Sequence, residues 1–172
     1  MVETINYEII RTVGKVEIRR YPKIIIAKVE DAANGFNLLY RFITGENKQR
    51  AKVKMTTPVV SSQQIKMTSP VFSEAGTMAF VMPSEYTIEN TPEPLSDQVK
   101  IDEIPSRLVA ALCFSGGWSE SHFEKETQEL LYELDQAKIK IKGNIFTMLY
   151  NPPFIPGFLR RNEVAVEVEQ AD

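Results

Sequence analysis

The sequence predicts a single α+β domain, and three observations support that prediction. Most of the chain alternates apolar and polar residues as short strands do, whereas two segments show the spacing of amphipathic helices. The chain also matches itself when it is shifted by 83 positions. Its 172 residues, of which 43% are apolar and 25% charged, are typical of one soluble domain that can bury a core.

The first helix is predicted over residues 32–44. Apolar residues recur there at i, i+3, i+4 and i+7 and form one face: Phe36, Leu39, Tyr40 and Ile43. Asp31 is the expected N-cap and Gly45 the expected C-cap.

The second helix is predicted to begin after Trp118, with Ser119 or Ser121 as its N-cap. Its buried stripe consists of apolar or small residues at helical spacing: Phe123, Thr127, Leu130, Leu131, Leu134 and Ala137. The glutamates between them indicate that the opposite side is solvated.

The rest of the chain supplies the predicted strands. Their approximate ranges are 5–12, 15–20, 24–30, 51–58, 65–72, 77–82, 98–103, 107–115, 145–150 and 162–168. Two of these strands share the sequence Lys-Met-Thr-x-Pro-Val, which follows one apolar residue in each of the segments 53–59 and 65–71. Their similarity predicts a hairpin with its turn at 61–64. The alternating run 138–142 is also expected to be a strand, with a solvated lysine face.

The 83-residue shift predicts two pseudo-equivalent halves, about 1–95 and 96–172, within the single domain 1–172. It places 16–18 on 99–101, Pro22 on Pro105, and 25–27 on 108–110. No Gly/Ser-rich linker separates the halves, so neither is expected to fold alone. A junction between such halves is a frequent place for a ligand cleft.

Composition excludes several function classes. The net charge of −3 is carried by interleaved acids and bases, which argues against a nucleic-acid partner. No apolar run approaches the length of a membrane span, and the first eight residues have neither a basic region nor a long apolar stretch, so no signal peptide is expected. Cys113 is the single cysteine, expected to be buried and inert, so a cytoplasmic location is predicted. Phosphate loops, nucleophile elbows and metal-protease motifs are not found, and the sequence sets no oligomeric state.

The paired Met-Thr-x-Pro-Val phrases resemble the SOUL family of heme-binding proteins, where such pairs are a hallmark. Further phrases of the family follow in order: Tyr7-Glu8-Ile9-Ile10, Phe80-Val81-Met82-Pro83, Tyr150-Asn151-Pro152-Pro153-Phe154 and Phe158-Leu159-Arg160-Arg161-Asn162-Glu163-Val164. The resemblance implies that two βαββ halves form a distorted antiparallel barrel with both helices outside. The family is similar in turn to the gyrase-inhibitor-like, effector-binding fold. A non-enzymatic binding protein for heme or a related tetrapyrrole, acting as carrier, buffer or sensor, is the function that the resemblance implies.

The resemblance also implies where heme would bind, in an apolar groove near the first helix and the loop before the last strand. The residues expected there are Phe36, Tyr40, Phe154, Phe158, Arg160 and Arg161. The arginines would reach the propionates. Two alternatives stay open: the apolar residues pack in the core, or the arginines pair with Glu163 or Glu167. No metal ligand is assigned, since His122 is the single histidine and is expected to be a solvated residue of the helix start rather than an axial ligand.

A second hypothesis is a module that binds small organic effectors, cationic ones included, in a cleft between the halves. Its expected lining is Glu163, Trp118, Tyr86 and Tyr150. Strand alternation leaves two orientations of Glu163 open. Facing the cleft, its carboxylate would have a raised pKa; facing solvent, the orientation we favour, it would be an ordinary surface acid.

Overall fold

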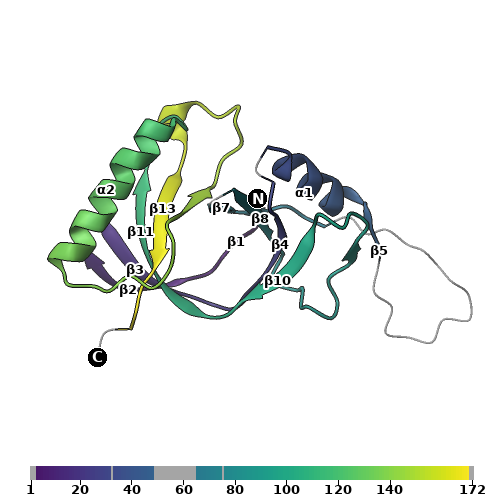
Figure 1. Ribbon diagram of the computed structural model, residues 1–172, viewed down its shortest axis with the longest axis horizontal. Helices are drawn as coiled ribbons and strands as arrows, with labels where there is room; N and C mark the ends of the chain where they lie inside the picture. Colours follow the sequence, from purple (N-terminus) through teal and green to yellow (C-terminus); the bar gives the residue numbers. More distant parts are fainter. Residues whose placement is uncertain (1–2, 32, 49–64, 75, 171–172) are drawn as a thin grey trace, which may run out of the picture.

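The computed structural model describes residues 3–31, 33–48, 65–74 and 76–170. Their main feature is a nine-stranded antiparallel sheet that curls into a half-barrel (Figure 1). In chain order its strands are β2 (Glu8–Val13), β3 (Val16–Tyr21), β4 (Ile24–Val29), β7 (Val71–Glu74), β8 (Thr77–Val81), β10 (Lys100–Ile104), β11 (Arg107–Phe114), β12 (Phe146–Leu149) and β13 (Asn162–Glu167). The helices are α1 (Gly35–Thr44), α2 (Glu120–Gln136) and the short 3-10 helix η1 (Gly157–Leu159).

Two short strand pairs lie outside the main sheet. β1 (Glu3–Thr4) pairs in parallel with β6 (Thr68–Ser69), and β5 (Asn47–Lys48) pairs with β9 (Glu93–Pro94). The predicted hairpin falls largely on residues 49–64, outside the described residues. Its second strand, predicted over 65–72, is divided between β6 and β7, because Pro70 has no N–H to donate to a ladder.

Both helices pack on the convex face of the sheet, α1 on β4 and β8, and α2 on β11 and β13. Residues that are directly paired on neighbouring strands lie on the same face of a sheet. Such pairs connect Ala27 and Phe80, beside α1, strand by strand to Asn162 and Phe114, beside α2. Both helices therefore lie on the same face. The α+β class, with a barrel-like sheet and external helices, is therefore confirmed.

The order of the strands is β10-β4-β8-β7-β12-β13-β11-β3-β2. The 83-residue shift brings β3, β4 and β8 onto or partly onto β10, β11 and β13, whereas it places β7 in the loop after β12. If β7 is matched with β12 by its position in the sheet, and β2 is set aside, the strand order reads alike from both ends. The register agrees as well, because the pair Tyr21–Arg107 of β3 and β11 corresponds to Ile104–Ile24 of β10 and β4. The duplication of the halves stays a prediction.

Two of the three predicted helix caps are confirmed. Ser119 caps α2, its Oγ accepting a hydrogen bond from the backbone N–H of His122, and Gly45 ends α1 with φ at 136°. The N-cap of α1 is Asn34 rather than Asp31, whose side chain instead accepts a hydrogen bond from the backbone N–H of Ala33.

The buried face of α1 differs from the predicted one. Its buried residues are Gly35, Leu39, Phe42 and Ile43. Phe36 and Tyr40, predicted on the same face, are 47% and 49% exposed. The helix is turned so that its predicted apolar face lies half in the core and half in solvent.

Candidate functional site

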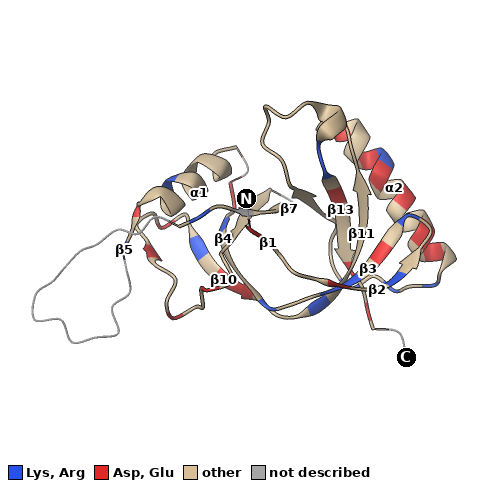
Figure 2. Ribbon diagram, turned by 180° about the vertical axis from the view of Figure 1, so that it is seen from behind, with Lys and Arg blue, Asp and Glu red and all other residues tan. Residues whose placement is uncertain are grey.

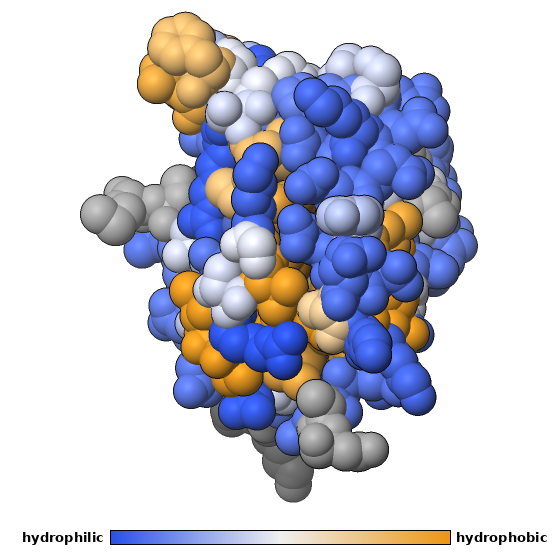
Figure 3. Space-filling view, turned by 90° about the vertical axis from the view of Figure 1, so that its left-hand side faces the viewer, coloured by the Kyte–Doolittle hydropathy of each residue, from blue (hydrophilic) through white to orange (hydrophobic). Residues whose placement is uncertain are grey.

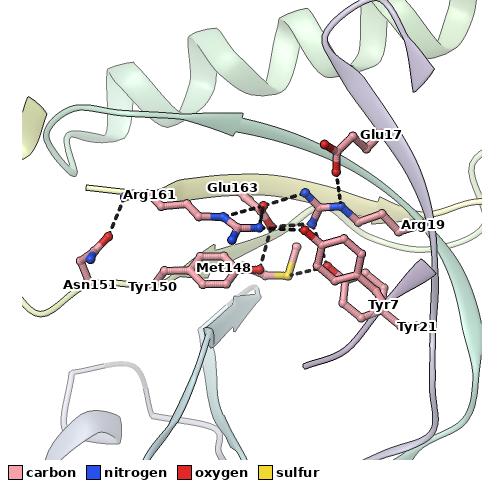
Figure 4. Close-up of polar contacts among 9 residues, drawn as sticks. All are labelled: Tyr7, Glu17, Arg19, Tyr21, Met148, Tyr150, Asn151, Arg161 and Glu163. Carbon is pink, nitrogen blue, oxygen red and sulfur yellow. Dashed lines mark hydrogen bonds and ion pairs between the residues drawn. The ribbon is translucent and has the colours of Figure 1, made fainter. Parts of the chain in front are cut away.

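The concave face of the sheet carries a buried ion pair between Arg19 of β3 and Glu163 of β13 (Figure 4). Arg19 is 1% exposed and Glu163 is fully buried. The two guanidinium nitrogens Nη1 and Nη2 of Arg19 donate to Oε2 and Oε1 of Glu163, both at 2.8 Å. This bidentate geometry is the strongest form of an arginine–carboxylate contact.

Arg161 and Tyr150 complete the coordination of the Glu163 carboxylate. Arg161 Nη2 donates to Oε1 at 2.8 Å, and the Tyr150 hydroxyl donates to Oε2 at 3.0 Å. Arg161 Nη2 also donates to the hydroxyl of Tyr7 at 2.9 Å, and its guanidinium lies 4.1 Å from the ring centre of Tyr150. Both carboxylate oxygens thus accept hydrogen bonds from more than one side chain.

Arg19, like Arg161, lies against aromatic side chains. The guanidinium of Arg19 lies 4.2 Å from the ring centre of Tyr7 and donates to the hydroxyl of Tyr21 at 2.8 Å. Its Nε donates to Glu17, a carboxylate at the edge of the cluster, at 2.8 Å. We call Tyr7, Arg19, Tyr21, Tyr150, Arg161 and Glu163 the concave cluster.

The cluster keeps Glu163 ionised. Burial raises the pKa of the Glu163 carboxyl, but the hydrogen bonds and positive charges of Arg19 and Arg161 lower it by more, so the net shift is below the usual 4.5. Burial also raises the pKa of Tyr21 to about 12, against the opposing charge of Arg19. Burial and then the charge of Glu163 raise the pKa of Tyr150.

These findings correct the sequence-based view of Glu163, which is neither a solvent-facing acid nor a cleft acid of raised pKa. The cavity next to the cluster, between Tyr21, Phe72 and Met148, measures about 10 Å³, too small for a ligand. The concave face at this point is filled by side chains. Strand alternation did not reveal this, because β13 is covered on both faces.

The residues expected around Glu163 are not all gathered there. Tyr150 contacts it, as described. Trp118 lies by the convex face, where its Nε1 donates to Asn162 Oδ1 at 2.7 Å. Tyr86 lies beside the α1 core and lines a separate recess of about 530 Å³ near the N-terminal segment.

A second candidate site is the exposed aromatic surface formed by α1 and the β12–β13 loop, residues 150–161. Phe36 and Tyr40 stack with ring centres 6.2 Å apart, and Phe36 meets the buried Phe80 edge-on. In the loop Phe154 is 82% exposed and Phe158 77% exposed. Figures 1 and 2 show the loop and the start of α1 at the same open side of the half-barrel. Figure 3 shows a hydrophobic knob at the top of the molecule, where Figure 1 places the loop.

The two arginines at the end of this loop already contact other groups of the protein. Arg160 Nε and Nη2 donate to the carbonyls of Ile155 and Pro153, and its guanidinium lies 4.1 Å from the ring centre of Trp118. Arg161 belongs to the concave cluster. Arg160 therefore holds the loop in shape, while Arg161 pairs with Glu163, the alternative that the sequence left open.

His122 and Cys113 lie on different elements, α2 and β11. His122 lies in the first turn of α2, half-buried against Phe114 at 5.0 Å between ring centres. Cys113, predicted to be buried, is exposed on β11 beside Glu163. Partial desolvation and then the charge of Glu163 raise the pKa of its thiol. Within the described part of the chain, no group of three His, Cys, Asp or Glu side chains is placed to hold a metal ion, and no helix could span a membrane.

Comparison with known proteins identifies the relatives of this architecture. The family model of the SOUL heme-binding protein matches residues 2–167. Heme-binding protein 2 of Homo sapiens is 32% identical over 161 residues, which cover 88% of this chain and 77% of that protein. Heme-binding protein 2 of Mus musculus is 30% identical over 151 residues, covering 82% and 72%. A crystal structure of a hydrolase from Listeria innocua aligns with a TM-score of 0.54 at 10% identity over 93% of this chain and 94% of the other, a likeness of fold alone.

Proposed function

This chain belongs to the SOUL heme-binding protein family, and from that membership we propose that it binds heme or a related tetrapyrrole at the exposed aromatic surface. The observation that carries the proposal is the exposure of large aromatic side chains on two segments at one side of the molecule: Phe36, Tyr40, Phe154 and Phe158. Exposed apolar groups gathered in this way are typical of binding sites.

The chemistry of these residues suits a tetrapyrrole. A porphyrin is a flat apolar ring, which aromatic side chains contact by offset or edge-to-face packing. Its propionates need a cationic donor at the edge of the surface. Arg160 uses Nε and Nη2 in its described hydrogen bonds, which leaves Nη1 for a propionate. The fixed position of this arginine means that little side-chain entropy is lost when a propionate binds.

We propose a non-enzymatic role, as a carrier, buffer or sensor, because the relatives are named for binding and the surface offers contact rather than reactive groups. In this proposal the iron receives no ligand from His122, whose ring packs against Phe114 on the side of α2. A small hydrophobic ligand of other chemistry would use the same contacts.

The alternative of a cationic effector at Glu163 has weaker support. Its carboxylate already accepts hydrogen bonds from two arginines and a tyrosine, and the neighbouring cavity of about 10 Å³ holds no organic molecule. A cation would also be repelled by Arg19 and Arg161. For this reason the aromatic surface is the site that we propose.

A hemin titration tests the proposal. The wild-type protein should show a saturable Soret change at one equivalent, and a Phe154→Ser/Phe158→Ser variant should bind roughly ten- to hundredfold more weakly, because two ring contacts are lost. Tyr132→Ser is the matched control, since Tyr132 is 59% exposed on α2, away from the surface. His122→Ala should keep the spectrum.

Two results would reject the aromatic surface as the site. One is a linear, unsaturable absorbance in the wild type, which would mean nonspecific association of hemin. The other is equal affinity of the loop variant and the Tyr132→Ser control.

A further inference from the structure

A recess of about 450 Å³ lies at the other end of the molecule, between β2, β3, the segment after α2 and the end of β13. Its apolar lining includes Ile10, Ile18, Leu108, Ile139 and Val168. Four of these belong to or pack against the convex core around α2, so the floor of the recess is the open edge of that core. Figure 3, which views this side, shows hydrophobic atoms in its lower half bordered by hydrophilic ones.

The charged lining of the recess is predominantly basic. Arg11, Arg20, Lys138 and Lys140 contribute to it, against the single acid Glu169. Among these, only Arg20 has an ion pair within the described residues, a loose one of 3.5 Å to Glu8. A recess of positive charge in a chain whose net charge is −3 focuses a field that attracts anions.

The end of α2 explains how the lysines come to this recess. Lys138 has a positive φ of 56°, and its N–H donates to the carbonyl of Asp135 while that of Ile139 donates to Leu134. This is a Schellman cap, in which Ile139 packs on Leu134 and the chain turns away from the helix. The backbone satisfies these carbonyls, so neither lysine is needed to cap the helix.

The run 138–142 is consequently not the strand that alternation predicted. Its single ladder contact in the described chain is an isolated bridge between Ile141 and Val168. The cap directs Ile139 into the floor and leaves Lys138 and Lys140 exposed at the edge of the recess. Residues 138–140 of this lysine-containing run therefore form part of a concave surface with an apolar floor.

We propose that this recess binds a small amphipathic organic anion, one carboxylate on a short aliphatic tail. The apolar floor would take the tail, and the three bases without a described acidic partner would take the head group. A volume of about 450 Å³ falls within the range of small-molecule sites. The recess shares no lining residue with the aromatic surface, so this inference does not depend on the proposed function.

An NMR titration of the ¹⁵N-labelled full chain with sodium decanoate tests the assignment. Saturable shifts are expected for the backbone amides of Ile18, Leu108 and Val168. A Lys138→Gln/Lys140→Gln variant should bind roughly three- to tenfold more weakly, because exposed ion pairs are individually weak. Lys142→Gln is the matched control: it removes the same charge from the same run, but Lys142 lies 3.7 Å from Glu167 and outside the recess.

The titration distinguishes a specific anion site in the recess from binding elsewhere or binding of the tail alone. Shifts confined to the recess, weakened in the double variant and by salt but not in Lys142→Gln, support the assignment. Shifts centred on the aromatic surface, equal affinity for the neutral analogue decanol, or an equal loss in Lys142→Gln would overturn it. The double variant should titrate with hemin as the wild type does. If the double variant loses both hemin and decanoate binding, the two ligands share one site and the assignment is overturned. If the Phe154→Ser/Phe158→Ser variant alone loses hemin binding, the result concerns only the heme proposal.

Discussion

Replacing Glu163 with glutamine tests whether the concave cluster is held together by charge. The substitution keeps the shape and one acceptor oxygen but leaves the Arg19 guanidinium, 1% exposed, without its main counter-charge. Breaking a buried ion pair at one partner costs about 3–5 kcal/mol. Glu17 still accepts a hydrogen bond from Arg19 Nε at 2.8 Å, so we expect a loss near the lower end, about 3 kcal/mol.

Urea unfolding monitored by circular dichroism measures this loss directly, and a thermal melt should fall by about 6–12 °C for a chain of this length. The control is Glu17→Gln, which removes an acid bonded to the same arginine but 35% exposed, and it should cost less than about 1 kcal/mol. If the two variants lose equal stability, or if Glu163→Gln unfolds at the wild-type urea concentration, the cluster does not stabilise the fold as argued. Pairing Glu163→Gln with Arg19→Met in a double-mutant cycle would give the coupling energy itself.

Three further predictions concern the same fold. The free energy of unfolding should fall in acid as the pH drops below 4.5 and through the lowered folded-state pKa of Glu163, since this carboxylate stabilises the fold only while ionised; Glu163→Gln should flatten that part of the pH profile. Ser119→Ala should cost about 0.5–2 kcal/mol by removing the N-cap of α2, measured by urea unfolding beside Ser121→Ala, whose side chain makes no backbone cap and should cost less. Leu134→Ala should cost about 2–5 kcal/mol because it opens a cavity under α2, while Tyr132→Ala on the exposed side should change stability by less than about 0.5 kcal/mol, and equal losses would contradict the packing described.

The features that the sequence predicted well are those decided by neighbouring residues. Ser119 begins α2 and Gly45 ends α1 as expected, because a cap depends on a few adjacent backbone groups. The strand ranges of the main sheet and the α+β class also follow from alternation. The family phrases place the chain in the SOUL family, yet they consist mainly of prolines and strand residues, so they carry little information about ligand contacts.

The orientation of side chains was predicted less well where a segment is covered on two sides. Phe36 and Tyr40 share the apolar spacing of Leu39, but the rotation of α1 on the sheet leaves them half in solvent. Cys113 continues an apolar run and is nevertheless exposed. The segment 138–142 alternates like a strand, but the Schellman cap before it turns it away from the sheet.

The concave cluster is the feature that local sequence patterns predicted least well. Alternation in β3 marks Glu17, Arg19 and Tyr21 as one polar face, which in an isolated strand would face water. Curling of the sheet covers that face, and strand register brings Glu163, 144 positions away, to 2.8 Å from Arg19. Pattern along the chain was sufficient for both helices, the strands of the main sheet, two helix caps and the family, since these depend on residues a few positions apart. Which charges become buried together depends on how distant strands align, because burying one charge is favourable only when its partner arrives at the same place.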